Sequence, residues 1–165
     1  MLIEKPLALI TCLLFSSSLT PTSINSYYLS KNVSSISQTN DPPFNLKEIE
    51  KQATKTPSGL KYIDLTLGTG DSPSRGKVII IKYTLRLTNG KKVDSTDDRG
   101  EDFRFRLGLR QVVKGLEEGV GTMKVGGKRR LIIPSTLGYG EAGNGTTVPS
   151  GAILVFDVEL VGVEL

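Results

Sequence analysis

The chain has 165 residues, of which 38% are hydrophobic, and its formal net charge is +4. It contains no histidine, no tryptophan and a single cysteine, Cys12. These absences exclude a His/Cys zinc site, a Ser-His-Asp triad, a Cys-His nucleophile pair and an internal disulfide. The net charge is too small to indicate binding to nucleic acid, and the apolar fraction suffices for one modest core.

The chain begins with an apolar run, 7–15, which follows Lys5 and precedes a run of serines. As a helix this run would span about 13 Å, which is too short to cross a bilayer. Its length and the small residues after it are typical of a signal peptide, so we predict a signal or targeting segment over 1–18. A lipoprotein-type modification at Cys12 and a buried element of the mature fold are the alternatives.

Residues 19–56 are interpreted as a linker that is first rich in Ser and Thr and then charged. Its first part lacks acidic residues, a composition shared by organellar transit segments and flexible linkers. A short helix is expected from about Leu46 to Gln52. The Pro57–Gly59 stretch ends it, and we place the start of the folded domain, 57–165, at this point.

From residue 60 onward, apolar and polar residues alternate with a period of two, which predicts strands. The clearest segment, 78–88, precedes Asn89-Gly90, a strong hairpin signal. Residues 95–102 are expected to form a charged loop, and residues 134–150 a glycine-rich loop. The expected strands are 60–65, 78–88, 91–94, 103–107, 128–133 and 153–160.

One segment, 112–120, has helical periodicity instead. Val113, Leu116 and Val120 fall on one helical face, and the charged residues of the segment are expected to stay in water. Its two glycines are expected to keep the helix short. Hairpin connections without βαβ spacing predict an α+β fold, in which five to six antiparallel strands form a curved sheet wrapped around this one short helix.

From residue 78 onward, five of the ten aromatic residues fall on the predicted strands and the glycine-rich loop. They would serve equally as plain core or as the lining of an open apolar pocket, and the pattern alone leaves both interpretations open. These residues are Tyr83, Phe103, Phe105, Tyr139 and Phe156. A basic run is interpreted as a solvated surface and comprises Lys124, Lys128, Arg129 and Arg130.

Four motifs resemble those of the FKBP-type peptidyl-prolyl cis-trans isomerases. They occur in the family's order and at its spacing, over residues 57–165. The resemblance implies the family's half-barrel sheet around one short helix, which agrees with the fold predicted above. The motifs are G-K-K-V-D-S at 90–95, V-V-K-G-L-E-E-G at 112–119, I-P-S-T-L-G-Y-G at 133–140 and L-V-F-D-V-E-L at 154–160.

The resemblance also implies a proline-binding pocket. Tyr83, Phe103 and Phe156 would form its walls. Tyr139 would offer its hydroxyl to a substrate carbonyl, and Asp94 would lie at the polar edge. The implied catalytic residues are therefore Tyr83, Asp94, Phe103, Tyr139 and Phe156.

Further residues are implied to contact the substrate. Val112 and Val113 would form the rim, Leu116 would form the floor, and Arg99 occupies a position that pairs with Asp94. The implied substrate-binding residues are Val93, Val112, Val113, Leu116, Thr147 and Val148, the last two in a flap between the final strands.

Two positions depart from the family pattern. Leu116 stands where the floor is usually tryptophan, and Val93 stands where a wall residue is usually phenylalanine. Both changes shrink the aromatic lining. Two functions therefore stay open: a peptidyl-prolyl cis-trans isomerase that accelerates rotation about Xaa-Pro bonds, and an FKBP-fold binding module or assembly chaperone with little isomerase activity.

The implied reaction requires no cofactor and no metal, because rotation about an amide breaks no covalent bond. Its uncatalysed barrier is about 18–20 kcal/mol, and a dry apolar pocket would bind the twisted amide better than either planar isomer. The resemblance implies proline-containing polypeptides as partners and macrolide inhibitors as ligands. We expect the protein to be a monomer without a stable membrane span and without a nucleic-acid partner.

The location favoured by the sequence is a plastid or its thylakoid lumen. The domain entry T-P-S-G-L-K-Y, at 56–62, resembles that of plastid and cyanobacterial members of the family. A periplasmic or secreted location is the alternative, since the targeting segment predicts export from the cytosol in each case.

Overall fold

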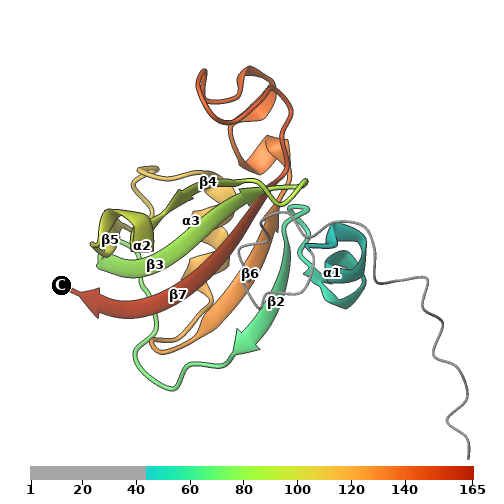
Figure 1. The fold of residues 1–165 in the computed structure, drawn as a ribbon. Coiled ribbons are helices and arrows are strands. Elements are labelled where there is room, and N and C mark those ends of the chain that lie inside the picture. The colour runs from blue at the N-terminus through green and yellow to red at the C-terminus, as the bar shows by residue number, and fades with distance from the viewer. Residues whose placement is uncertain (1–43) are drawn as a thin grey trace, which may run out of the picture. The chain divides into compact units, whose positions relative to one another are not determined.

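The computed structural model describes residues 44–165 (Figure 1). The predicted targeting segment, 1–18, and the linker up to residue 43 lie outside the described residues. The described part belongs to one compact unit. Its α-helices are α1 (Leu46–Gln52), α2 (Thr96–Arg99) and α3 (Lys114–Gly121), and two short 3-10 helices, η2 (Ser135–Leu137) and η3 (Gly140–Ala142), lie in the expected glycine-rich loop. Its strands are β1 (Thr54–Lys55), β2 (Lys61–Thr66), β3 (Val78–Leu87), β4 (Lys92–Ser95), β5 (Phe103–Arg106), β6 (Lys128–Ile133) and β7 (Leu154–Glu164).

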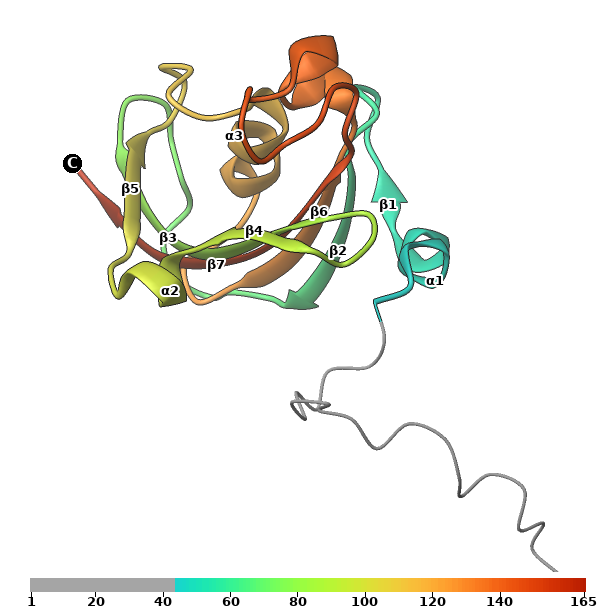
Figure 2. The same ribbon diagram turned by 45° about the horizontal axis from the view of Figure 1, so that its top comes forward.

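The strands form one antiparallel sheet with the order β1-β2-β6-β7-β3-β4. Strand β5 pairs with the first half of β3, and β4 pairs with its second half. The sheet curves around α3, which fills its concave side (Figure 2). The predicted antiparallel α+β fold is therefore confirmed, with the two-residue strand β1 as an addition to the five or six strands expected.

Helix α3 packs so closely on β6 that two of its positions require glycine. A Cβ on Gly115 would lie within 3.0 Å of two side-chain carbons of Ile133, and one on Gly119 would lie 2.5 Å from Leu131 Cδ2. The sequence suggested only that these glycines shorten the helix. They also let its backbone approach the sheet, and this fixes the buried side chain of Leu116.

The expected charged loop at 95–102 contains helix α2. The Ser95 side chain accepts a hydrogen bond from the Asp97 amide at 3.2 Å, which caps the start of the helix. Gly100, with φ 72°, ends it in the left-handed region. The expectation of a loop was wrong because one helical turn is too short to produce a periodic apolar pattern.

Arg129 is buried, so the interpretation of the basic run as a solvated surface is wrong for this residue. Its guanidinium donates to Asp64 Oδ1 at 2.6 Å and lies over the Tyr62 ring, 4.3 Å from the centroid. It also donates to the Gly119 carbonyl at 2.8 Å and to Thr122 Oγ1 at 2.6 Å. Arg129 thus joins β2 and β6 to the C-terminal end of α3, where a cation is favourable.

The helix expected at 46–52 is present as α1, next to the edge of the sheet that β1 forms (Figure 2). The Lys61 Nζ–Glu50 Oε1 ion pair, at 2.8 Å, and the pairing of β1 with β2 connect this segment to the sheet. None of the helices in residues 44–165 is long and apolar enough to cross a membrane.

Candidate active site

Three aromatic side chains from three strands meet on the concave side of the sheet. Tyr83 of β3 lies 5.7 Å from Phe103 of β5 in a T-shaped arrangement and 5.5 Å from Phe156 of β7, between ring centroids. Strand β3 lies between β5 and β7, so the register of the sheet brings these rings together. Quadrupole contacts of this kind stabilise a fixed aromatic wall.

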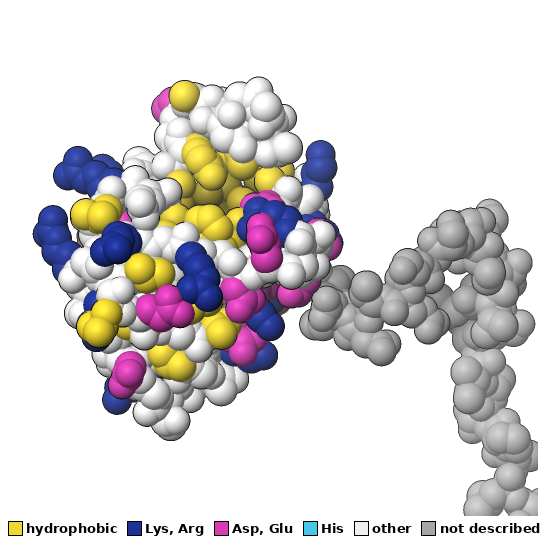
Figure 3. Space-filling view, turned by 90° about the vertical axis from the view of Figure 1, so that its left-hand side faces the viewer, with side chains coloured by type: hydrophobic (Ala, Val, Ile, Leu, Met, Phe, Trp, Pro, Cys, Tyr) yellow, Lys and Arg dark blue, Asp and Glu magenta, His cyan; other side chains and the backbone are white. Residues whose placement is uncertain are grey.

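A hollow lies beside this part of the molecule, beneath the projecting 134–152 loop, and Figure 3 shows hydrophobic side chains gathered in it. Phe156 and Leu116 are buried, whereas Tyr83 and Phe103 are only half-buried. The half-buried Val93, Val112 and Val113 pack against the same apolar cluster. The fold therefore brings eight of the eleven predicted site residues to this cluster, seven of them by way of β3, β4, β5, β7 and the start of α3 and the eighth, Val148, from the 134–152 loop.

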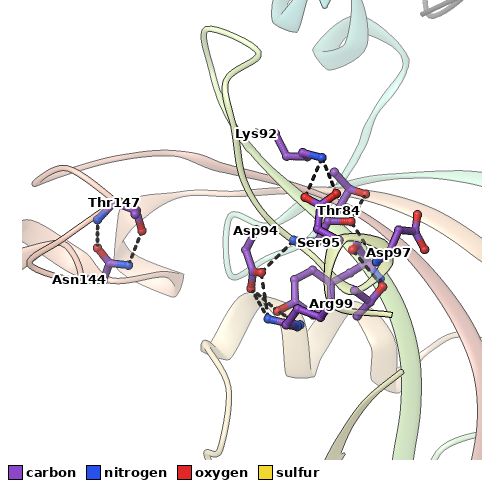
Figure 4. Close-up of polar contacts among 11 residues, drawn as sticks. Thr84, Lys92, Asp94, Ser95, Asp97, Arg99, Asn144 and Thr147 are labelled. Carbon is purple, nitrogen blue, oxygen red and sulfur yellow. Dashed lines mark hydrogen bonds and ion pairs between the residues drawn. The ribbon is translucent and has the colours of Figure 1, made fainter. Parts of the chain in front are cut away.

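A polar network fixes the hydroxyl of Tyr83. The hydroxyl donates to Asp94 Oδ2 at 2.6 Å and accepts a hydrogen bond from Arg99 Nη2 at 2.9 Å. Arg99 Nη1 lies 2.9 Å from both oxygens of Asp94 (Figure 4), which confirms the expected pairing of these two residues. The Ser95 amide donates to Asp94 Oδ1 at 2.8 Å, so both carboxylate oxygens of Asp94 are occupied.

The network shifts the pKa values of its members. Burial alone would raise the pKa of Asp94, but hydrogen bonds from Tyr83 and Arg99, together with the guanidinium charge, hold it below its ordinary value. Burial and the hydrogen bond to Asp94 raise the pKa of Tyr83, although Arg99 acts in the opposite direction. At neutral pH the network therefore consists of a neutral phenol between a carboxylate and a guanidinium.

Helix α2 positions the arginine of this network. Thr96 Oγ1 accepts a hydrogen bond from the Tyr83 amide at 3.0 Å and donates to the Tyr83 carbonyl at 3.3 Å. This docks the first turn of α2 on β3, and its last residue, Arg99, then lies over the Tyr83 ring, 5.4 Å from the centroid. The Ser95-x-x-Asp98 pattern before Gly100 is the sequence signal that would have found α2.

The 134–152 loop carries Tyr139, Thr147 and Val148. The Tyr139 side chain is 40% exposed, and its hydroxyl has no hydrogen-bond partner within residues 44–165, so it is accessible to a ligand. Val148 is buried and belongs to the core cluster, whereas Thr147 is exposed. Val148 therefore attaches the loop to the body of the domain.

Asn144, which sequence reasoning missed, organises this loop. Its Oδ1 accepts hydrogen bonds from the amides of Thr146 at 3.1 Å, Thr147 at 2.9 Å and Val148 at 2.7 Å. Its Nδ2 donates to Thr147 Oγ1 at 3.0 Å (Figure 4). The Asn144-Gly145 dipeptide is a turn signal that would have drawn attention to this residue.

Two glutamates of α3, expected to stay in water, are also engaged. Glu117 Oε1 accepts hydrogen bonds from the amides of Gly108 at 3.2 Å and Arg110 at 3.0 Å. Glu118 accepts a hydrogen bond from the Ser58 hydroxyl at 2.8 Å. Glu117 thereby holds the turn that leads into the predicted rim of the pocket.

A second hollow, of about 190 Å³, is lined by Tyr83 and, among others, by five charged residues: Lys82, Asp97, Lys128, Asp157 and Glu159. Several of these charges are already paired, as in the Lys128–Glu159 ion pair at 3.1 Å. Such a lining is unfavourable for an apolar ligand, because contact with one would remove water from the charged groups. Within residues 44–165, no group of three or more His, Cys, Asp or Glu residues could hold a metal ion.

The sequence matches a family model described as FKBP-type peptidyl-prolyl cis-trans isomerase over residues 70–161, which is more than half of the chain. The chain belongs to this family. The FKBP family binds proline-containing substrates, and the matched segment carries every site residue predicted from the sequence. The assignment drawn from the four motifs is therefore confirmed.

Curated relatives are about 50% identical to this FKBP domain over the matched segments. FK506-binding protein 4 of Dictyostelium discoideum is 52% identical over 105 residues, which cover 64% of this chain but only 28% of that protein. FK506-binding protein of Neisseria meningitidis serogroup B is 49% identical over 105 residues, which cover 64% of this chain and 96% of that protein. The chain thus spans about a quarter of the first relative and nearly all of the second.

Solved structures share the fold. The crystal structure of FkpA from Escherichia coli matches with a TM-score of 0.65 and 38% identity, covering 70% of this chain and 53% of that one. The crystal structure of AtFKBP13 matches with a TM-score of 0.64 and 36% identity, covering 67% of this chain and 97% of that one. Both support the FKBP-like arrangement of sheet and helix.

Proposed function

We propose that this domain is an active peptidyl-prolyl cis-trans isomerase that works in the aromatic hollow. The observation that carries the proposal is the meeting of Tyr83, Phe103 and Phe156 at centroid distances of 5.5–5.7 Å around Tyr83. Membership of the FKBP family supports the same conclusion. The prolyl ring would insert between these side chains.

Differential binding is sufficient to explain the catalysis. A planar amide is more polar than a twisted one, because rotation removes the resonance between nitrogen and carbonyl. A dry pocket therefore favours the twisted amide, and each 1.4 kcal/mol of preference accelerates rotation about tenfold. In this scheme the Tyr139 hydroxyl binds a substrate carbonyl, and Val112 and Val113 hold the chain at the rim above Leu116.

Asp94 is proposed to act by positioning. Its carboxylate already accepts hydrogen bonds from Tyr83, Arg99 and the Ser95 amide. A carboxylate with lowered pKa and occupied oxygens is a poor proton acceptor, and amide rotation transfers no proton. Asp94 would instead hold the Tyr83 ring upright against Phe103, while Val93, Thr147 and Val148 complete the substrate contacts.

The test is the cis-to-trans rate of a Leu-Pro peptide at micromolar protein. Phe103→Leu removes one ring of the wall, and Arg104→Gln, whose side chain leaves the same strand in the opposite direction toward Glu164, is the matched control. We expect acceleration by the wild type, a loss of about tenfold or more in kcat/KM for Phe103→Leu, and little change for the control. No acceleration by the wild type would contradict the proposal.

The same assay separates the isomerase from the alternative, a binding module or assembly chaperone. That alternative predicts a nearly inactive wild type, in which Leu116→Trp and Val93→Phe together restore a high rate. The isomerase predicts an active wild type that these substitutions improve by no more than about tenfold. Binding without catalysis, followed by a sharp gain in the double variant, would favour the binding module.

We propose further that 57–165 is the isomerase domain, that it acts as a monomer on proline-containing polypeptides, and that macrolide inhibitors occupy the same hollow. The apolar run at 7–15 supports export from the cytosol. A plastid or thylakoid lumen is the favoured destination, with the periplasm or secretion as alternatives. N-terminal sequencing of the mature protein tests this, because removal of 1–18 or more is expected and an intact Met1 would oppose it.

A further inference from the structure

Basic side chains without an ion-pair partner gather at one end of the sheet. Within residues 44–165, ten lysines and arginines form no ion pair, and half of them lie where β3 begins and β5 ends. Four of these five are exposed, and Lys77 is half-buried. This basic end comprises Arg75, Lys77, Arg106, Arg110 and Lys114.

Backbone hydrogen bonds bring these side chains together from separate parts of the chain. The Gly76 amide donates to the Leu107 carbonyl at 2.9 Å, and the Leu107 amide donates to the Lys77 carbonyl at 3.0 Å. The Arg75 side chain runs over Gly108, where a Cβ would lie 2.7 Å from Arg75 Cγ. An open recess of about 470 Å³ lies beside Gly108, and its lining includes Arg75, Leu107 and Lys114.

The acidic residues of this recess are Glu117 and Glu118, and both already accept hydrogen bonds within the protein. Glu117 accepts hydrogen bonds from the amides of Gly108 and Arg110, and Glu118 accepts one from the Ser58 hydroxyl. Arg75 and Lys114 line the recess and balance these two carboxylates, so the positive excess of the basic end comes from Lys77, Arg106 and Arg110 beside it. The basic end is therefore suited to an anionic partner.

The turn that carries Arg110 leads directly into the predicted rim of the proline pocket. Arg110 has φ 58°, a left-handed conformation that residues other than glycine rarely adopt. Glu117 holds this turn through the Arg110 amide at 3.0 Å. Val112 and Val113 follow two and three residues later, and Figure 3 shows basic side chains along the left edge of the face that contains the hydrophobic hollow.

We propose that the basic end selects client polypeptides with acidic residues a few positions from the isomerised proline. An extended peptide advances about 3.3 Å per residue, so residues near a proline in the hollow come within reach of Arg110 and Lys114. The occupant of this surface is the acidic flank of the client itself. This inference rests on the proposed isomerase function and specifies its substrate class.

The test compares three Leu-Pro peptides that differ only in their flanks, which carry glutamate, glutamine or lysine. At low ionic strength we expect kcat/KM for the acidic peptide to exceed that for the neutral one about five- to tenfold, with the basic peptide slowest. The preference should shrink toward unity at about 0.5 M salt. The double variant Arg75→Gln/Arg110→Gln should lose most of the preference and keep its rate on the neutral peptide.

The matched control is Lys47→Gln/Lys55→Gln, which removes the same charge from unpaired lysines of α1 and β1 and should keep the preference. Equal rates for acidic and neutral peptides, or an equal loss in both double variants, would overturn the inference while leaving the isomerase intact. If the wild type accelerates isomerisation of none of the three peptides, the proposed isomerase function itself would be overturned. Thermal unfolding of each variant checks that it is folded.

Discussion

The two sides of the candidate pocket are held in different ways. The floor rests on close apolar contact between α3 and β6, where Gly119 lies against Leu131 and the buried Arg129 fastens the end of the helix. Within the flap, 134–152, three backbone amides donate hydrogen bonds to Asn144, an exposed residue, and the buried Val148 attaches the flap to the core cluster. The close packing at the floor couples the pocket to the global fold, whereas the hydrogen bonds within the flap are a local arrangement.

The largest effect is expected at the floor. Gly119→Ala places a methyl group 2.5 Å from Leu131 Cδ2, so we expect the free energy of unfolding to fall by about 3 kcal/mol and the isomerase rate to fall as the helix moves outward. Chemical denaturation measures the first effect. Gly121→Ala is the control, because its nearest neighbour would be Leu107 Cδ2 at 3.9 Å, and an equal effect of both would contradict the close-packing account.

A somewhat smaller loss is expected for Arg129→Met. The substitution removes the hydrogen bonds that Arg129 donates to Asp64, Gly119 and Thr122. Because Asp64 is partly exposed, we expect the free energy of unfolding to fall by about 2 kcal/mol rather than by the full effect of breaking a buried pair. Lys128→Met, which breaks an exposed pair with Glu159, should change stability by less than about 1 kcal/mol. Similar results for both variants would mean that Arg129 does not fasten the helix.

The flap should respond locally. Asn144→Ala removes the acceptor of three loop amides, so we expect faster hydrogen exchange at Thr147 and Val148 and a several-fold lower isomerase rate, with global stability within about 1 kcal/mol. Thr146→Ala, which keeps the backbone amide, is the control. A global loss as large as that of Gly119→Ala would end the distinction between floor and flap.

The smallest effect concerns pH. Asp94 has a lowered pKa in the folded state, so its contribution to stability is present above the ordinary aspartate pKa of about 4 and is lost as pH falls through the lowered value. Asp94→Asn should therefore reduce the free energy of unfolding by about 0.5–1 kcal/mol at pH 7, and this difference should vanish in strong acid. Asp98→Asn, in an exposed pair with Lys92, is the control, and a constant difference across pH would contradict the account.

What the sequence predicted followed from repeated local patterns. The alternation of apolar and polar residues located the long strands, and helical spacing located α3. The family resemblance predicted that Asp94 pairs with Arg99. The interpretation of Arg129 was wrong because its partner Asp64 is distant in the chain, and no local pattern tells whether an arginine meets such a partner or water. Helix α2 and Asn144 left only short cap and turn signals, which are individually weak.

The most direct test of the central claim, that the aromatic hollow is the site of isomerisation, is amide chemical-shift mapping with a Leu-Pro peptide in cis-trans exchange. We expect the largest changes at Phe103, Val113 and Tyr139, together with accelerated exchange of the peptide signals. Changes centred on Lys128 and Glu159 of the charged hollow, with the aromatic hollow unperturbed, would contradict this claim.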